Sequence, residues 1–301
     1  MIQLNNIVVQ FGDKKVLNGI TTTFQPGEII GLVAPNGTGK STLLNVLMNY
    51  VTPTKGEVTF KESYRYANKK KEAYIHSLIT MMPDQSDLYN HLNGVDHLNI
   101  YRQMWHHSSI DPGQVIQRLN MSHYIKDKTY QYSLGMRQRL CFAMLIVANT
   151  PYMLMDEVMN GLDPDNVELI SKLLEEKKKE GKIIIIASHL LENLEKYADR
   201  ILFLKGGEFI YTRDYREKAP DDAVFLKFSS RENGKVIEEI KAFIPDLDYK
   251  ELANERVIMD VHQFSKERNL QLQEHLKNNV QLKMEIGPLD LLDRYSLYYS
   301  S

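Results

Sequence analysis

Three apolar runs along the chain lack the polar and apolar alternation of a half-exposed strand. They cover residues 28–33, 152–155 and 182–187. Continuous apolar segments of this length are typical of strands that are buried on both faces, as in the parallel sheets of α/β proteins. Each run is followed at once by small, polar or charged residues, at 35–41, 156–157 and 188–189. Because open α/β sheets bind ligands at the carboxyl ends of their strands, we expect a site where these runs end.

Helical patterns lie between the first two runs, at residues 94–105, 114–121 and 135–147. They predict a helical subdomain over about residues 88–147. The α/β pattern stops near residue 215, where the polar, proline-containing segment 215–222 follows. We interpret that segment as a linker between a first domain, residues 1–214, and a C-terminal accessory domain, residues 223–301.

The pattern of the C-terminal domain is β-α-β-β-α-β, which matches a ferredoxin-like α+β unit. We expect strands at 223–228, 249–252, 256–261 and 280–286, and helices at 235–243 and 265–277. The domain has no recognisable catalytic set, and its histidines, His262 and His275, lack the spacing of metal ligands. A regulatory or dimer-stabilising role is therefore the expectation for it.

Composition and charge restrict the kinds of molecule that this protein can bind. The 301 residues are 43% hydrophobic and 25% charged, with a formal net charge of -2, which is typical of a globular protein and gives no basic field for nucleic acid. The single cysteine, Cys141, excludes an internal disulfide and stands in an apolar run typical of a core. That run, residues 140–148, is too short to cross a bilayer, and the N-terminus has no secretory signal pattern.

The segment after the first apolar run, Gly31-Leu-Val-Ala-Pro-Asn-Gly-Thr-Gly-Lys-Ser-Thr42, comes close to a phosphate-binding loop. In the pattern Gly-x-x-x-x-Gly-Lys-Ser/Thr, Ala34 stands where the first glycine belongs. We expect a negative φ at Ala34, because a left-handed conformation costs a residue with a Cβ about 1–2 kcal/mol. Lys40 would reach the β- and γ-phosphates, and Ser41 would bind Mg²⁺. The residues predicted to bind nucleotide here are Asn36, Gly37, Thr38, Gly39, Lys40, Ser41 and Thr42.

The second apolar run ends in an acidic pair, Asp156 and Glu157. An aspartate at the end of an apolar strand is the residue that holds Mg²⁺ opposite a phosphate loop. A neighbouring carboxylate can orient and deprotonate an attacking water. We therefore predict Asp156 as a metal ligand and Glu157 as the catalytic base.

The order of these motifs resembles the ATP-binding subunit of an ATP-binding cassette (ABC) transporter, over about residues 1–215. The segment Tyr132-Ser-Leu-Gly-Met-Arg-Gln-Arg-Leu140 resembles the family signature Leu-Ser-Gly-Gly-Gln, with matches at Ser133 and Gly135 and departures at Leu134 and Met136. The form Ser-Leu-Gly-Met is similar to that of bacitracin- and lantibiotic-resistance exporters. The resemblance implies a P-loop NTPase core with a mixed sheet, an antiparallel β subdomain and a helical subdomain.

Further site residues follow from the resemblance. Asp163 would lie at a dimer seam, and His189 would contact the γ-phosphate as a catalytic residue with Glu157 and Lys40. Phe11 matches the aromatic residue that stacks on adenine, although a generic turn aromatic is the alternative. At the family's glutamine position stands Asp84, with Gln85 one residue later, and either could complete the Mg²⁺ shell.

The family resemblance also implies an activity and partners. We expect an ATP hydrolase, with ATP and Mg²⁺, that works in a head-to-tail dimer with a second such subunit, so that Ser133 and Gly135 act in trans. Two membrane-spanning permease subunits or domains would bind it at the cytoplasmic face of the membrane, in a bacterium by expectation. Export of an antibiotic, peptide or other amphipathic compound is the leading hypothesis. The alternatives are an importer ATPase and a soluble ABC ATPase without a transport role.

Overall fold

In the computed structural model, the described residues are 1–189, 191–217, 224–229, 233–245, 248–253, 255–261, 264–265, 267–268, 270–272, 274 and 284–299. The chain divides into two compact units, Met1–Arg216 and Glu217–Ser301, whose boundary falls inside the predicted linker 215–222. Residues 218–222 of that linker, and His262 and His275, lie outside the described residues.

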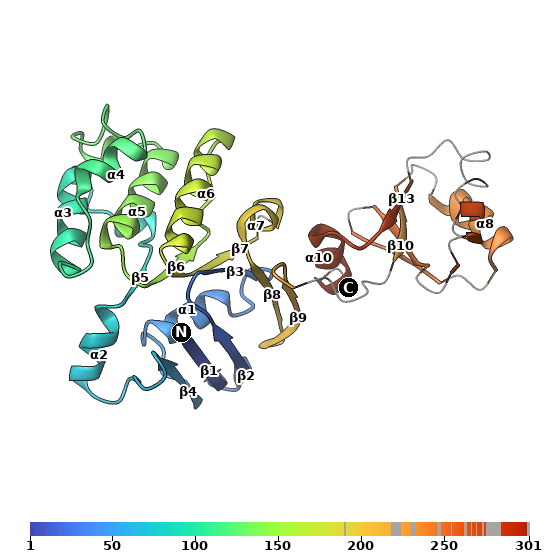
Figure 1. The fold of residues 1–301 in the computed structure, drawn as a ribbon, viewed down its shortest axis with the longest axis horizontal. Coiled ribbons are helices and arrows are strands. Elements are labelled where there is room, and N and C mark those ends of the chain that lie inside the picture. The colour runs from blue at the N-terminus through green and yellow to red at the C-terminus, as the bar shows by residue number, and fades with distance from the viewer. Residues whose placement is uncertain are drawn as a thin grey trace. The chain divides into compact units, whose positions relative to one another are not determined.

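A six-stranded sheet forms the centre of the first unit (Figure 1). Its strands are, in spatial order, β5 (Ile79–Met81), β6 (Tyr152–Asp156), β7 (Ile183–Ser188), β3 (Glu28–Val33), β8 (Arg200–Lys205) and β9 (Glu208–Asp214). The first five strands pair in parallel and β9 is antiparallel. Every residue of β3 and β7 is buried, as the three apolar runs predict. The mixed sheet therefore has the predicted architecture.

A second, antiparallel sheet and a group of helices complete this unit. The sheet order is β2 (Lys14–Phe24), β1 (Ile2–Phe11), β4 (Lys55–Phe60). The helical lobe contains α3 (Gly94–Met104), α4 (Pro112–Arg118) and α5 (Leu134–Ala148), close to the three predicted helices. The remaining helices are α1 (Lys40–Leu47), α2 (Lys69–His76), α6 (Pro164–Lys179) and α7 (Leu191–Tyr197), with short 3₁₀ turns at Gln85–Asp87 and Thr129–Gln131.

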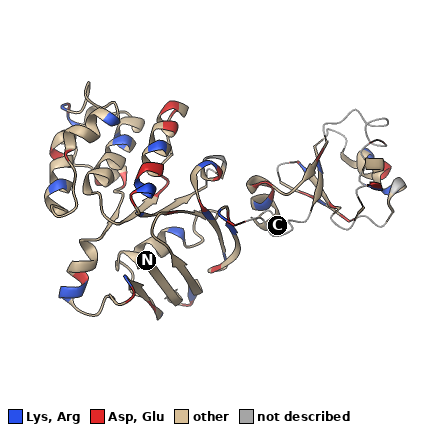
Figure 2. Cartoon of the chain, viewed as in Figure 1, with Lys and Arg blue, Asp and Glu red and all other residues tan. Residues whose placement is uncertain are grey.

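The helices differ in how far they are buried. Helix α5 is buried continuously from Leu140 to Ala148, which includes Cys141, so it forms the core of the helical lobe. Helix α6 instead carries charges of both signs along its length (Figure 2), among them the exposed pair Glu168 and Lys172. No helix in the described part of the chain is long and apolar enough to cross a bilayer.

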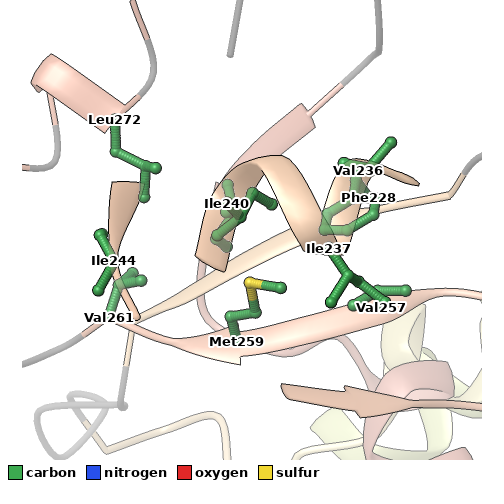
Figure 3. Close-up of a cluster of buried hydrophobic side chains, with 10 residues drawn as sticks. Phe228, Val236, Ile237, Ile240, Ile244, Val257, Met259, Val261 and Leu272 are labelled. Carbon is green, nitrogen blue, oxygen red and sulfur yellow. The ribbon is translucent and has the colours of Figure 1, made fainter. Parts of the chain in front are cut away.

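The second unit contains a four-stranded antiparallel sheet in the order β11 (Tyr249–Glu251), β12 (Val257–Asp260), β10 (Phe225–Phe228), β13 (Met284–Gly287). This is the strand order of a ferredoxin-like unit, as the sequence predicts. Helix α8 (Asn233–Phe243) covers one face, where its apolar residues pack with those of β10 and β12 (Figure 3). Of the helix predicted at 265–277, residues 267–268, 270–272 and 274 are described and are helical. Residues 280–283, predicted as part of the last strand, lie outside the described range.

One helix of the second unit is absent from the sequence-based prediction. Helix α10 (Leu291–Tyr299) follows β13, and Leu297 packs against buried Ile258 and Leu289. Arg256 ties this helix down, with Nη1 donating to Asp290 Oδ2 at 2.8 Å and to Asp293 Oδ1 at 2.9 Å. Asp293 is fully buried, so this ion cluster is part of the core of the unit.

A second buried ion cluster stands at the start of β3 in the first unit. Glu28 is fully buried, with Oε1 lying 2.9 Å from Arg200 Nε and 3.1 Å from Arg216 Nη2, while Oε2 accepts the Gln25 N–H at 2.7 Å. Burial raises the pKa of Glu28 more than these partners lower it. The carboxylate thus stabilises the fold only while its cationic partners stay in place.

We predict that Glu28→Ala lowers the free energy of unfolding of the first unit by on the order of 3 kcal/mol, because Arg200 would be left buried without its counter-ion. Denaturant unfolding followed by the fluorescence of Trp105, the single tryptophan and a residue of this unit, measures the change. The control is Glu57→Ala, which breaks an exposed pair with Arg65 and should cost less than about 1 kcal/mol. Equal losses in the two variants would contradict the prediction.

Candidate functional site

The loop between β3 and α1 has the backbone of a phosphate cradle. Gly37 has φ +75° and Gly39 has φ +114°, and Gly39 is also the N-cap of α1. Ala34 is fully buried and is not among the described residues with a positive φ, so the expected negative φ is confirmed. The alanine that replaces the first glycine of the pattern therefore requires no unusual backbone.

Lys40 lies folded across this loop. Its ammonium donates to Ala34 O at 2.6 Å and to Pro35 O at 3.3 Å, and the residue is only 5% exposed. Burial lowers the pKa of Lys40, and the carboxylates of Glu157 and Asp156 oppose that shift. The charge is thus held by two carbonyl groups and two nearby acids, and a phosphate group could replace those carbonyls.

Ser41 and Asp156 meet at the carboxyl end of β6. Ser41 Oγ donates to Asp156 Oδ2 at 2.6 Å. Burial raises the pKa of Asp156, and the serine hydroxyl lowers it. A hydroxyl and a carboxylate oxygen that converge in this way are hard oxygen ligands of the kind that Mg²⁺ prefers.

Glu157 has an unusual backbone. Its φ is +52°, a left-handed conformation that costs a residue with a Cβ about 1–2 kcal/mol. The Glu157 N–H donates to Ala187 O at 2.9 Å, and its carbonyl accepts the Asn160 N–H at 3.1 Å. Its side chain is 24% exposed, and Oε2 lies 2.9 Å from His189 Nδ1. The turn after β6 thus directs the carboxylate of Glu157 toward the histidine that follows β7.

The phosphate loop and the acidic pair line one cavity of about 930 Å³. Ten of the predicted site residues line it: Asn36, Gly37, Gly39, Lys40, Ser41, Thr42, Asp84, Gln85, Asp156 and Glu157. Thr38 lies in the same loop, with its hydroxyl donating to Pro35 O at 2.7 Å. His189 reaches the site through Glu157. The structure therefore brings together the phosphate loop, the acidic pair and the residues at 84 and 85.

Four other predicted residues do not line this cavity. Phe11, at the end of β1, is 54% exposed. Ser133 is the N-cap of α5, where its Oγ accepts the Met136 N–H at 3.3 Å, and Gly135 follows in the first turn. Asp163 is the exposed N-cap of α6, and hydrogen bonds from Asn166 lower its pKa. All four lie outside the cavity of their own subunit.

The residues at 84 and 85 have different partners. Asp84 Oδ1 accepts the Ser86 N–H and the Ser86 hydroxyl, and its charge contributes to the raised pKa of Asp156. Gln85 Nε2 donates to Gln138 Oε1 at 2.5 Å. Asp84 therefore acts electrostatically on the metal-binding candidate, whereas the amide of Gln85 is bound to α5.

Sequence reasoning missed a second part of the cavity. Away from the loop the wall contains aromatic and methionine side chains, of which Tyr50, Tyr89 and Met104 are more than half exposed. It also missed Gln138, a buried polar residue of α5 that lines the same cavity. The available signal was the position of Gln138 five residues after the N-cap of a mainly apolar helix, because a buried amide in such a helix requires partners.

We predict that Gly39→Ala weakens binding of ATP more than Gly37→Ala does. A Cβ at residue 39 would lie 3.1 Å from Val16 O, whereas at residue 37 nothing lies within 4 Å, although both positions have positive φ. The left-handed strain of about 1–2 kcal/mol is common to both variants, so the close contact with Val16 O decides the difference, which we expect to reach roughly tenfold in affinity. Titration with a fluorescent ATP analogue measures the difference. Ala34→Gly, the control, should bring no gain in affinity, and a clear gain would contradict our interpretation of the loop.

Comparison with known proteins identifies the family to which this site belongs. The family model described as ABC transporter matches residues 17–160. The lantibiotic transport ATP-binding protein SrtF of Streptococcus pyogenes is 30% identical over 215 residues, which cover 71% of this chain and 91% of that protein. The linearmycin resistance ATP-binding protein LnrL of Bacillus subtilis is 28% identical, covering 70% of this chain and 68% of that protein.

Solved structures agree on the fold. A dimeric ATP-binding cassette in a post-hydrolysis state, bound to ADP and Pi, superposes with a TM-score of 0.65 at 22% identity, covering 72% of this chain and 100% of that one. The match with SrtF extends over nearly all of that protein, and the family model spans the phosphate loop and the acidic pair. The chain therefore belongs to the ABC transporter family, as one of its ATP-binding and ATP-hydrolysing subunits.

Proposed function

We propose that this chain is the motor subunit of an ABC exporter, in which hydrolysis of MgATP between two cassettes drives transport through separate membrane subunits. The observation that carries the proposal is the convergence of Lys40, Ser41, Asp156 and Glu157 on one cavity. These are a phosphate-binding cation, two oxygen ligands and a base, which are the parts that phosphoryl transfer to water requires.

The donor set fits a Mg²⁺ ion that is shared with the nucleotide. Ser41 and Asp156 would hold it, and Asp84 and Gln85, which line the same cavity, are the two candidates for the residue that completes the shell. Within the described ranges no group of three or more His, Cys, Asp or Glu could hold a metal ion. When bound, the ion would neutralise charge on the phosphate oxygens.

Glu157 is the general base of the proposal. Its carboxylate is partly exposed to the cavity and would accept a proton from the attacking water. His189, 2.9 Å from Glu157 Oε2, would orient that carboxylate and contact the γ-phosphate. Lys40 would leave the carbonyl groups of residues 34 and 35 to bind the β- and γ-phosphates. The predicted phosphate-loop residues would hold the same groups through their backbone N–H groups.

The site is completed by a second subunit. Ser133, Gly135 and Asp163 begin helices outside the cavity, and the first N–H groups of a helix have no acceptor within it. The N–H groups at the start of α5, beside Ser133 and Gly135, are therefore suited to bind the γ-phosphate of a nucleotide on a facing subunit, and Asp163 would lie at the dimer seam. Phe11, exposed at the end of β1, would stack on the adenine. A head-to-tail dimer brings these two halves together.

The aromatic end of the cavity supports the proposal that this subunit binds a membrane partner. Exposed Tyr50, Tyr89 and Met104 lie there beside the loop of residues 83–89. His97 fixes this loop, because its Nε2 accepts the Tyr89 N–H at 3.0 Å while Nδ1 lies 2.8 Å from Asn93 O. We propose that two permease subunits or domains bind here at the cytoplasmic face of a bacterial membrane. The C-terminal unit, residues 223–301, would serve assembly or regulation.

Export as the direction, and a peptide or antibiotic as the cargo, are supported by the relatives. SrtF is named for lantibiotic transport and LnrL for linearmycin resistance. The cell-based test uses a host that lacks this chain and is complemented with either the wild type or Glu157→Gln. Only the wild type should raise the concentration of lantibiotic-type peptide that stops growth. Equal sensitivity of all strains across such peptides would remove this class of cargo.

Glu157→Gln should lower the rate of ATP hydrolysis by at least about 100-fold, because the amide cannot accept a proton. The variant should still bind MgATP and accumulate as a closed dimer. Phosphate release measures the first effect, and size-exclusion chromatography with and without MgATP measures the second. Glu168→Gln, which changes an exposed acid on α6, is the matched control. Undiminished hydrolysis by Glu157→Gln would remove Glu157 from the role of base.

Two inactive variants should restore activity to each other if the sites are shared. Mixing Lys40→Ala with Ser133→Arg gives mixed dimers that keep one intact site, so about a quarter of the wild-type rate should return in an equal mixture of a symmetric dimer. Steady-state hydrolysis before and after mixing measures the recovery. Absence of recovery would either place Ser133 in the same site as Lys40 or make the partner a different chain.

A further inference from the structure

The side chain of Gln138 connects three parts of the first unit. It projects from α5, is only 4% exposed, and donates from Nε2 to Glu157 O at 3.0 Å and to Val158 O at 2.9 Å. Its Oε1 accepts the amide of Gln85 at 2.5 Å. A single buried amide thus joins three elements: helix α5, which begins in the segment that resembles the family signature, the loop that carries Gln85, and the turn after β6.

The orientation of this amide is fixed by its partners. Two carbonyl oxygens, those of residues 157 and 158, face one end of it, and carbonyls can only accept hydrogen bonds. The NH₂ group must therefore point to them, which leaves Oε1 of Gln138 toward Gln85. The same reasoning requires Gln85 to present its own NH₂ group. The direction of the whole chain of hydrogen bonds follows from the two backbone carbonyls.

The carbonyl groups that Gln138 binds belong to the strained turn. Glu157 has φ +52°, and a residue with a Cβ leaves this conformation unless its surroundings hold it. The N–H of Glu157 is held by Ala187 O of β7, and its carbonyl by Gln138 and the Asn160 N–H. Rotation of the backbone to a negative φ would move that carbonyl away from both donors. Gln138 therefore opposes the change that would redirect the Glu157 carboxylate.

We propose that Gln138 is a positioning residue for hydrolysis, which holds the backbone of Glu157 in its left-handed conformation and couples it to Gln85. The proposal rests on the role of Glu157 as base in the function proposed above. Gln138 would act on hydrolysis through the backbone of Glu157, which its amide binds. Because the amide also binds Gln85, a displacement of the loop or of α5 changes the position of the base without breaking the nucleotide-binding loop.

The test uses full-length variants at residue 138. Gln138→Met keeps the approximate shape and removes both donors, and Gln138→Glu keeps an acceptor for Gln85 but places oxygens against the two carbonyls. We expect kcat to fall at least about tenfold in Gln138→Met, because a misplaced base loses much of its effect. KM and the affinity for MgATP should stay within about threefold, since an interaction that acts only on the chemical step changes kcat alone. The fall should be greater in Gln138→Glu.

Controls separate positioning from folding. Gln117→Met, at an exposed residue of α4, should leave both kinetic constants unchanged. Denaturant unfolding followed by Trp105 fluorescence confirms that each variant is folded. Gln138→Asn is the milder variant, because its amide is too short to span the same partners yet stays polar, and it should also lose kcat. A folded Gln138→Met or Gln138→Asn with the wild-type kcat overturns the proposal, as does a fall confined to affinity.

Glu157→Gln is measured in the same series. Loss of turnover in Glu157→Gln together with wild-type turnover in Gln138→Met overturns the positioning role and leaves the proposed function intact. Full turnover in Glu157→Gln overturns the proposed function itself.

Discussion

The parallel register of β6, β7 and β3 is the constraint on which the site depends. Asp156 pairs with Ala187, and Val33 pairs with Ser188, so the three strands end within about one residue of each other. A residue along a strand advances about 3.3 Å, and a shift by one reverses the faces of all its side chains. A slip of β6 against β7 would therefore separate Glu157 from His189 and turn Asp156 away from Ser41. Both β3 and β7 pair with a neighbour on each edge, so a slip of either strand would disrupt two sets of backbone hydrogen bonds at once.

The electrostatics of the site follow from this alignment. A buried lysine, Lys40, and a partly buried aspartate, Asp156, have pKa values shifted by burial in opposite directions, down for the lysine and up for the aspartate. Each pKa shift arises because burial removes water from the charged group and so disfavours its charged form. Under the proposed function, a triphosphate with a divalent cation would supply an anion for Lys40 and a cation for Asp156, so binding would stabilise both charges at once.

Much of the fold and most of the site could be predicted because they depend on local patterns. The apolar runs revealed β3, β6 and β7, and the small polar residues after them revealed the loop, the acidic pair and His189. The φ of Glu157 could not be predicted, since glutamate has no preference for the left-handed region and long-range hydrogen bonds impose it. The partners of Gln138 were hidden for the same reason. Helix α10 was missed because its docking depends on Arg256, which is distant in sequence.

Under the proposed function, the division between buried and exposed site residues would explain why the subunit acts as a pair. Lys40, Asp156 and the turn at Glu157 are fixed by packing within one chain, so they are formed as soon as the subunit folds. Ser133, Asp163 and Phe11 instead lie outside the cavity, at helix N-termini or at a strand end. The N–H groups at a helix N-terminus bind a phosphate more strongly than they bind water. An exposed aromatic ring likewise gains more free energy from stacking on a purine than from contact with water. In the proposed dimer, nucleotide bound to the first group would give Ser133 of a facing subunit its partner, while Phe11 would stack on the adenine held by its own subunit. ATP binding and dimer closure would then become one equilibrium.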